Sequence, residues 1–104
     1  MTEKHGHPRF YELLEEMAIL HSCKNKDYSG DNPLSNLKLC TQIGLPAWKG
    51  IIVRLMDKWS RLIHFTKKET FEVKNESFKD TLLDNAIYSL LCIILFEERL
   101  NDNS

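Results

Sequence analysis

The stretch from residue 75 to residue 100, "NESFKDTLLDNAIYSLLCIILFEERL", decides the fold of this chain. From its eighth residue onward it has the composition of an apolar helix, and Asn75 or Ser77 can cap the start. Ser77 with Asp80 also matches a capping box. Steps of three, four and seven residues place Asp80 and Asp84 at the head of an otherwise apolar face. The sequence therefore predicts a helix to about residue 100 whose first turns carry two carboxylates.

Three upstream segments also have helical spacing. Pro8 begins the first, and apolar residues follow on one stripe to about residue 23. The polar segment "KNKDYSGDNP" predicts a loop, after which Asn32-Pro33 opens a short helix that stops at Gly44. A third long helix is expected over about residues 46–67.

In that third long helix, apolar side chains fill one broad arc and charged side chains occupy the other side. We expect the apolar arc to face the core. Its members are Trp48, Ile51, Ile52, Leu55, Met56, Trp59, Leu62 and Ile63. The opposite side carries Arg54, Asp57, Lys58 and Arg61. We expect these charged residues to face solvent in a monomer or to line a shared cleft in an oligomer.

Four helices joined by short connections predict an all-α, four-helix-bundle-like domain over residues 1–104, with flexible ends at 1–7 and 101–104. A chain of 104 residues buries only a modest core, which favours a homo-oligomer. The 14 basic and 15 acidic residues nearly balance, so no global field indicates a nucleic acid or a membrane as partner.

Composition and motifs exclude several classes of protein. Three cysteines without a CxxC spacing argue against a disulfide framework or a zinc site and fit a reducing cytoplasm. The N-terminus has no apolar signal region, and the run "SLLCIILF" is too short to span a bilayer. The glycine motifs of P-loop, dinucleotide-binding and α/β-hydrolase proteins are missing from the sequence.

Asp80 and Asp84 allow two interpretations. Near a helix start they can stay hydrated and favour the helix dipole. Alternatively, with Glu76 one turn earlier, they are candidate ligands for Mg²⁺ or Mn²⁺, because hard cations prefer oxygen ligands and Mg²⁺ often takes only one or two carboxylates.

Lys58 and Arg61, with Arg54 nearby, are candidate phosphate-binding cations. The alternative is a solvated helix face on which Asp57 pairs with Arg61.

Three more polar groups lie in the first helix and the loop after it. His21 falls on the apolar stripe, where an isolated histidine is more often a hydrogen-bonded boundary residue than a ligand. Lys26, Asp27 and Tyr28 combine a cation, a carboxylate and an aromatic ring that could stack on a base, although an ordinary polar turn has the same composition. Glu12 and Glu15 form an ExxE pattern used by all-α nucleotide pyrophosphatases, but they lie opposite the apolar stripe, which favours a solvated face.

The order of these motifs resembles a family of small domains called nucleotide-modification-associated, found in phage and bacterial genomes. The resemblance covers about residues 21 to 95. It rests on Lys26-Asp27-Tyr28, Asn36, Asp57-Lys58 with Arg61, and Glu76 with Asp80, Asp84 and Tyr88. More distantly, the chain is similar to the MazG and dimeric dUTPase group of nucleoside triphosphate pyrophosphatases, although its second acidic motif is E-x-x-x-D-x-x-x-D rather than ExxD and lies far downstream of the ExxE.

The resemblance implies a cytoplasmic, nucleotide-handling protein of a bacterial cell or phage-infected host. We expect Mg²⁺-dependent hydrolysis or modification of a (deoxy)nucleoside phosphate, or else a nonenzymatic protein that sequesters a nucleotide. A protein-interaction module is the third possibility. The residues implied in catalysis are Asp27, Asp80 and Asp84; those implied in substrate binding are Lys26, Tyr28, Asn36, Lys58, Arg61 and Tyr88; and the implied metal ligands are Glu76, Asp80 and Asp84.

Overall fold

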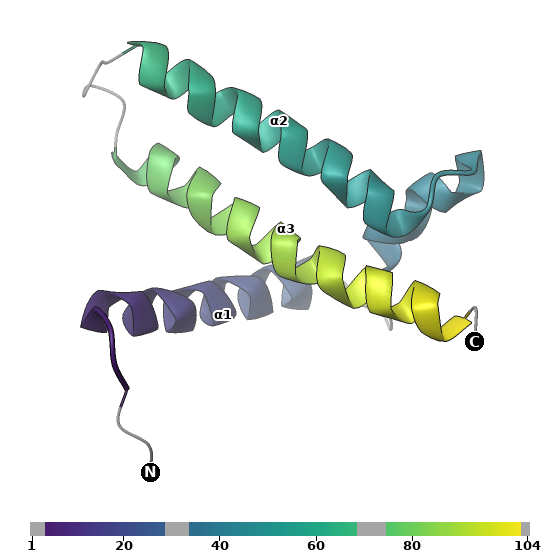
Figure 1. Cartoon of the computed structure of the whole chain (residues 1–104), viewed down its shortest axis with the longest axis horizontal. Coiled ribbons are helices and arrows are strands. Elements are labelled where there is room, and N and C mark those ends of the chain that lie inside the picture. The colour runs from purple at the N-terminus through teal and green to yellow at the C-terminus, as the bar shows by residue number, and fades with distance from the viewer. Residues whose placement is uncertain (1–3, 29–33, 69–74, 103–104) are drawn as a thin grey trace. The chain divides into compact units, whose positions relative to one another are not determined.

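The computed structural model describes residues 4–28, 34–68 and 75–102 (Figure 1). Every element of secondary structure in these residues is helical, so the predicted all-α class is confirmed. The elements are α1 (Pro8–Tyr28), the 3-10 helix η1 (Ser35–Ile43), α2 (Ala47–Lys68) and α3 (Asn75–Asp102). None of the described helices combines the length and hydropathy that a membrane crossing requires. The chain divides into two compact units, Met1–Pro33 and Leu34–Ser104.

The first unit contains α1, which begins at Pro8 as expected and runs to Tyr28. The predicted end at about residue 23 was wrong, because Lys24–Tyr28 continue the helix instead of opening the loop. Lysine is a good helix former, and the first glycine after His21 is only Gly30. The side chain of Asn25 also donates a hydrogen bond of 2.9 Å to the carbonyl oxygen of His21 on the previous turn.

In the second unit, α2 and α3 lie side by side and run in opposite directions (Figure 1). Buried aliphatic side chains from both helices form the core between them. They are Ile51 and Leu62 from α2, and Ile87, Leu91 and Leu95 from α3. The α3 residues recur every fourth position, which keeps them on one side of the helix. The predicted bounds of both long helices are confirmed to within two residues.

Aromatic pairs at both ends of the two helices define their register. Phe65 near the end of α2 stacks on Phe78 near the start of α3, with ring centroids 4.8 Å apart. At the other end, Trp48 meets Phe96 edge to face at 5.3 Å. Each of these arrangements stabilises a pair by about 1 kcal/mol beyond the area that it buries. A shift of either helix along the other would separate both pairs.

One part of the prediction for α2 was wrong. Lys58 was placed on the side opposite the apolar arc, but it faces α3 and its side chain is only 14% exposed. Met56 and Trp59 were placed in the core arc, but they are 65% and 54% exposed in the structure. The reason is geometric: the apolar arc of α2 is wider than the strip that one neighbouring helix covers. Packing on α3 uses one edge of the arc and leaves the other edge outside.

The short helix before α2 packs against it at close range. It forms as a 3-10 helix and stops, as predicted, at Gly44, whose φ of 85° is left-handed and favours glycine. Cys40 of η1 rests on Gly50 of α2: a Cβ added at Gly50 would lie 2.6 Å from the Cys40 sulfur. A glycine at this point of α2 therefore allows η1 to pack.

We expect Ile51→Ala to lower the free energy of unfolding by about 3 kcal/mol, because Ile51 is 1% exposed and its loss leaves a cavity between α2 and α3. Ile43→Ala is the matched control, since Ile43 is 84% exposed and its truncation should cost less than about 0.5 kcal/mol. Urea unfolding followed by circular dichroism measures both. Equal losses in the two variants would contradict the proposed core.

Candidate functional site

Four side chains of the second unit converge where the middle of α2 meets the first half of α3. Arg54 and Lys58 come from α2, and Asp84 and Tyr88 from α3. The Nζ atom of Lys58 lies 3.5 Å from Oδ2 of Asp84 and donates a hydrogen bond to it. We call these four residues the Lys58 cluster. It joins Lys58 to Asp84 and Tyr88, three residues that the sequence had predicted to share a site.

Tyr88 holds the two cations of the cluster. The Lys58 ammonium lies 5.0 Å from the centre of its ring, and the Arg54 guanidinium carbon lies 6.0 Å from it. Cations are attracted to the face of an aromatic ring at these distances. Both cations of the cluster therefore lie against the same aromatic ring.

The charge of the cluster is unbalanced. Two cations face one carboxylate, and the Lys58 and Asp84 side chains are only 14% and 26% exposed. Partial burial reduces the screening of these charges by water. The Arg54 side chain is exposed and its guanidinium carries five donors, so the open side of the cluster offers hydrogen bonds to an anion.

The other predicted residues of the second unit lie on η1, α2 and α3. Asp80 is exposed, one turn before Asp84 on α3. Arg61 is exposed on α2, and no ion pair joins it to Asp57 within the described part of the chain. Asn36 is exposed on η1. The side chain of Glu76 lies outside the described residues.

The predicted residues of the first unit all belong to α1. Lys26 is exposed, and the side chains of Asp27 and Tyr28 lie outside the described residues. Glu12 forms an ion pair of 3.1 Å with Arg9 and is 64% exposed, so the solvated-face interpretation is confirmed for this residue. The interpretation of His21 as a hydrogen-bonded boundary residue is also confirmed. Its ring and its carbonyl oxygen both lie within hydrogen-bond distance of the Asn25 side-chain amide.

Across residues 4–28, 34–68 and 75–102, no three His, Cys, Asp or Glu side chains gather closely enough to hold a metal ion. Asp80 and Asp84 remain candidate oxygen ligands on neighbouring turns of α3, and Glu76 lies one turn earlier. In the structure, one oxygen of Asp84 already accepts a hydrogen bond from Lys58.

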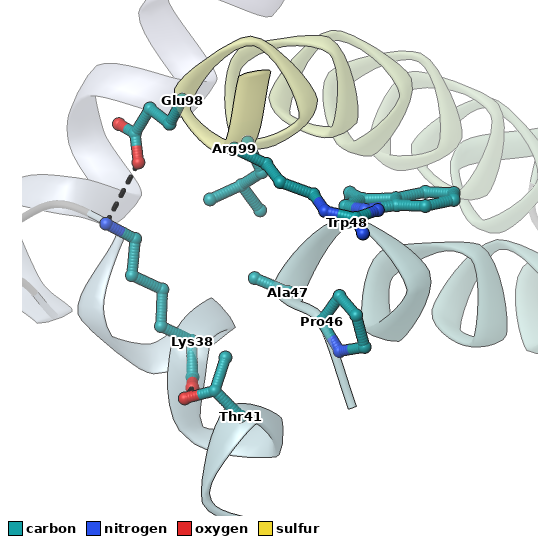
Figure 2. Close-up of a pocket in the computed structure, with 8 residues that line it drawn as sticks. Lys38, Thr41, Pro46, Ala47, Trp48, Glu98 and Arg99 are labelled. Atoms are coloured by element: carbon teal, nitrogen blue, oxygen red, sulfur yellow. Dashed lines mark hydrogen bonds and ion pairs between the residues drawn. The ribbon is translucent and has the colours of Figure 1, made fainter. Parts of the chain in front are cut away.

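A separate cavity of about 270 Å³ lies between η1, the start of α2 and the end of α3 (Figure 2). Lys38 and Glu98 reach toward each other across one side of it and form an ion pair of 3.0 Å. Arg99 covers the ring of Trp48 at 5.7 Å. The Trp48 indole N–H is buried and has no hydrogen-bond acceptor among the described residues.

Sequence reasoning missed this cavity. Its lining residues are Lys38, Thr41, Pro46, Ala47, Trp48, Leu95, Glu98 and Arg99, and no predicted site residue is among them. Trp48 had been assigned to the core arc. The charged members come from η1 and α3, about 60 residues apart in sequence, and nothing in the local spacing of either segment indicates that they meet.

We expect Asp84→Asn to destabilise the protein by about 1 to 2 kcal/mol, because it leaves the poorly exposed Lys58 ammonium without its charged partner. Asp80→Asn is the matched control on the preceding turn and should change the free energy of unfolding by less than about 0.5 kcal/mol, since Asp80 is exposed. Thermal unfolding at neutral pH compares the two. An equal or larger loss in Asp80→Asn would contradict the assigned pairing.

Cys23 and Cys92 should differ in reactivity. Burial raises the pKa of the Cys92 thiol, and its sulfur lies 3.5 Å from the carbonyl oxygen of Trp48, to which it can donate. Less Cys92 is therefore thiolate at pH 8, whereas Cys23 is exposed. We expect iodoacetamide to alkylate Cys23 about ten times faster than Cys92, as measured by peptide mass spectrometry. Faster labelling of Cys92 would show that α3 is not packed against Trp48 of α2 as described.

Comparisons with known proteins give no relative for this chain. No protein-family model matches it, and neither do any curated protein or any solved structure. The family resemblance drawn from the sequence therefore stays a prediction, and the assignment of function depends on the residues and contacts described above.

Proposed function

We propose that the protein binds a nucleoside phosphate, with the phosphate groups at the Lys58 cluster. The observation that carries this proposal is the 3.5 Å contact between Lys58 and Asp84 beside the ring of Tyr88. These residues come from different helices and were selected from the sequence as parts of one nucleotide site. The resemblance to nucleotide-modification-associated domains supports the ligand class.

The electrostatics of the cluster favour an anionic ligand. Lys58 is already paired with Asp84, so the exposed guanidinium of Arg54 beside them is the cation of the cluster that can bind an incoming phosphate. Charge-assisted hydrogen bonds from lysine and arginine to phosphate are among the stronger polar contacts in proteins. Tyr88 holds both cations near one point, which reduces the entropy lost when a phosphate binds.

Mg²⁺-dependent hydrolysis is the second candidate function. The observation in its favour is that Asp80 lies exposed one turn before Asp84, so two carboxylates border the proposed phosphate site. A bound Mg²⁺ would offset phosphate charge and supply a water for in-line attack. Binding without hydrolysis is the better supported of the two, because Lys58 already balances the charge of Asp84.

The first test is equilibrium binding of a panel of ribonucleotides and deoxynucleotides, with and without Mg²⁺, followed by chromatography of what is recovered. We expect Arg54→Gln and Lys58→Ala each to weaken binding of the best ligand about tenfold or more, the equivalent of about 1.4 kcal/mol. Lys67→Ala removes an exposed lysine from the last turn of α2 and should leave affinity unchanged. Equal affinity in all three variants, or no binding by the parent protein, would overturn the proposal.

Asp84→Asn distinguishes binding from hydrolysis at the same site. In a protein that only binds, removing this negative charge should leave the affinity for phosphate the same or raise it, and the ligand should return intact. In a hydrolase, the same substitution should abolish a turnover that the parent protein shows. A product formed equally by both proteins would exclude Asp84 from the chemistry.

A further inference from the structure

Helix α2 carries a second apolar surface that does not face α3. Ile52, Met56, Trp59 and Ile63 recur at steps of four, three and four residues, so they form one stripe along the helix. They are 42%, 65%, 54% and 52% exposed, and Val53 at the edge of the stripe is 52% exposed. We call these five residues the α2 stripe.

The α2 stripe is large enough to matter for association. At about half exposure, a side chain of this size leaves on the order of 100 Å² in contact with water, and five such residues offer on the order of 500 Å². A standard protein interface takes about 800 Å² from each partner. The stripe therefore supplies most of such an area, and it includes tryptophan and methionine, which are enriched in interfaces.

We infer that the α2 stripe is the contact surface between two copies of this chain. The step pattern of four, three and four residues reads the same from either end. When a second α2 packs against the first in the antiparallel direction, Ile52 of one copy meets Ile63 of the other, and Met56 meets Trp59. A two-fold axis needs this self-complementarity, in which the same patch serves both partners. No charged residue interrupts the stripe.

This interface leaves the Lys58 cluster open. At about 100° per residue, Arg54 is roughly opposite Met56 on the helix, and Lys58 lies on the side that faces α3. Pairing through the α2 stripe thus covers one side of α2 while α3 and the cluster occupy the other. Dimer formation and nucleotide binding can therefore be tested separately.

The mass of the full chain in solution tests this inference. Analytical ultracentrifugation should give about twice the chain mass of 12.2 kDa at micromolar concentration. Met56→Glu should raise the dimer dissociation constant at least 100-fold, because two carboxylates would be desolvated against Trp59. Ile43→Glu, the same kind of change at an apolar residue that is 84% exposed outside the stripe, should leave the dimer intact. A parent protein that stays monomeric up to 1 mM, or equal effects of both variants, would overturn the inference and assign the stripe to another occupant.

Fluorescence of Trp59 provides a second readout that needs no disruptive variant. The sequence contains two tryptophans, so Trp48→Phe leaves Trp59 as the reporter. Its emission should shift to longer wavelength when the protein is diluted through the dissociation constant, since Trp59 leaves the interface for water. Emission that does not change while the mass falls from dimer to monomer would place the interface elsewhere. Met56→Glu should keep the nucleotide affinity of the parent protein, so that failure of the dimer does not imply failure of the nucleotide site.

Discussion

The antiparallel register of α2 on α3 is the constraint on which the rest of the second unit depends. Buried aliphatic side chains hold the two helices together, and the Phe65–Phe78 and Trp48–Phe96 pairs fix their position along the shared axis. The same register sets Lys58 opposite Asp84 and brings Arg54 to Tyr88. The polar cluster is therefore a product of the packing, and a displacement by one turn would pair Lys58 with a different side chain of α3.

Long, strongly periodic segments were predictable, and irregular ones were not. The bounds of α2 and α3 follow from apolar periodicity and from clear start signals. The end of α1 was predicted too early because polar residues such as Lys24 and Asn25 suggest a loop by composition. Lysine nevertheless favours a helix, and the Asn25 side chain donates a hydrogen bond to the preceding turn. The 3-10 geometry of η1 could not be read from its sequence, since an α-helix of that length has the same spacing of apolar residues.

The candidate site was only partly predictable, because it depends on how the two long helices face each other. Spacing along α3 correctly placed Asp84 on the face that continues into apolar residues, but spacing along α2 could not say which edge of its wide apolar arc would meet α3. Spacing therefore placed Lys58 opposite the apolar arc, and its cation–π contact with Tyr88 does not follow from that spacing. The cavity beside Trp48 depends on three separate segments, so no single stretch of sequence predicts it. In both cases, sequence periodicity does not predict how far one helix is rotated about its own axis relative to its neighbour.

The contact between Gly50 and Cys40 links two positions of the chain in their tolerance to change. Because a methyl group at position 50 would occupy space that the Cys40 sulfur now fills, alanine at position 50 requires that sulfur to move or a smaller side chain at position 40. Helix propensity alone would favour that alanine over glycine by about 1 kcal/mol. The packing of one side chain in η1 thus opposes the residue that helix propensity favours at position 50 of α2.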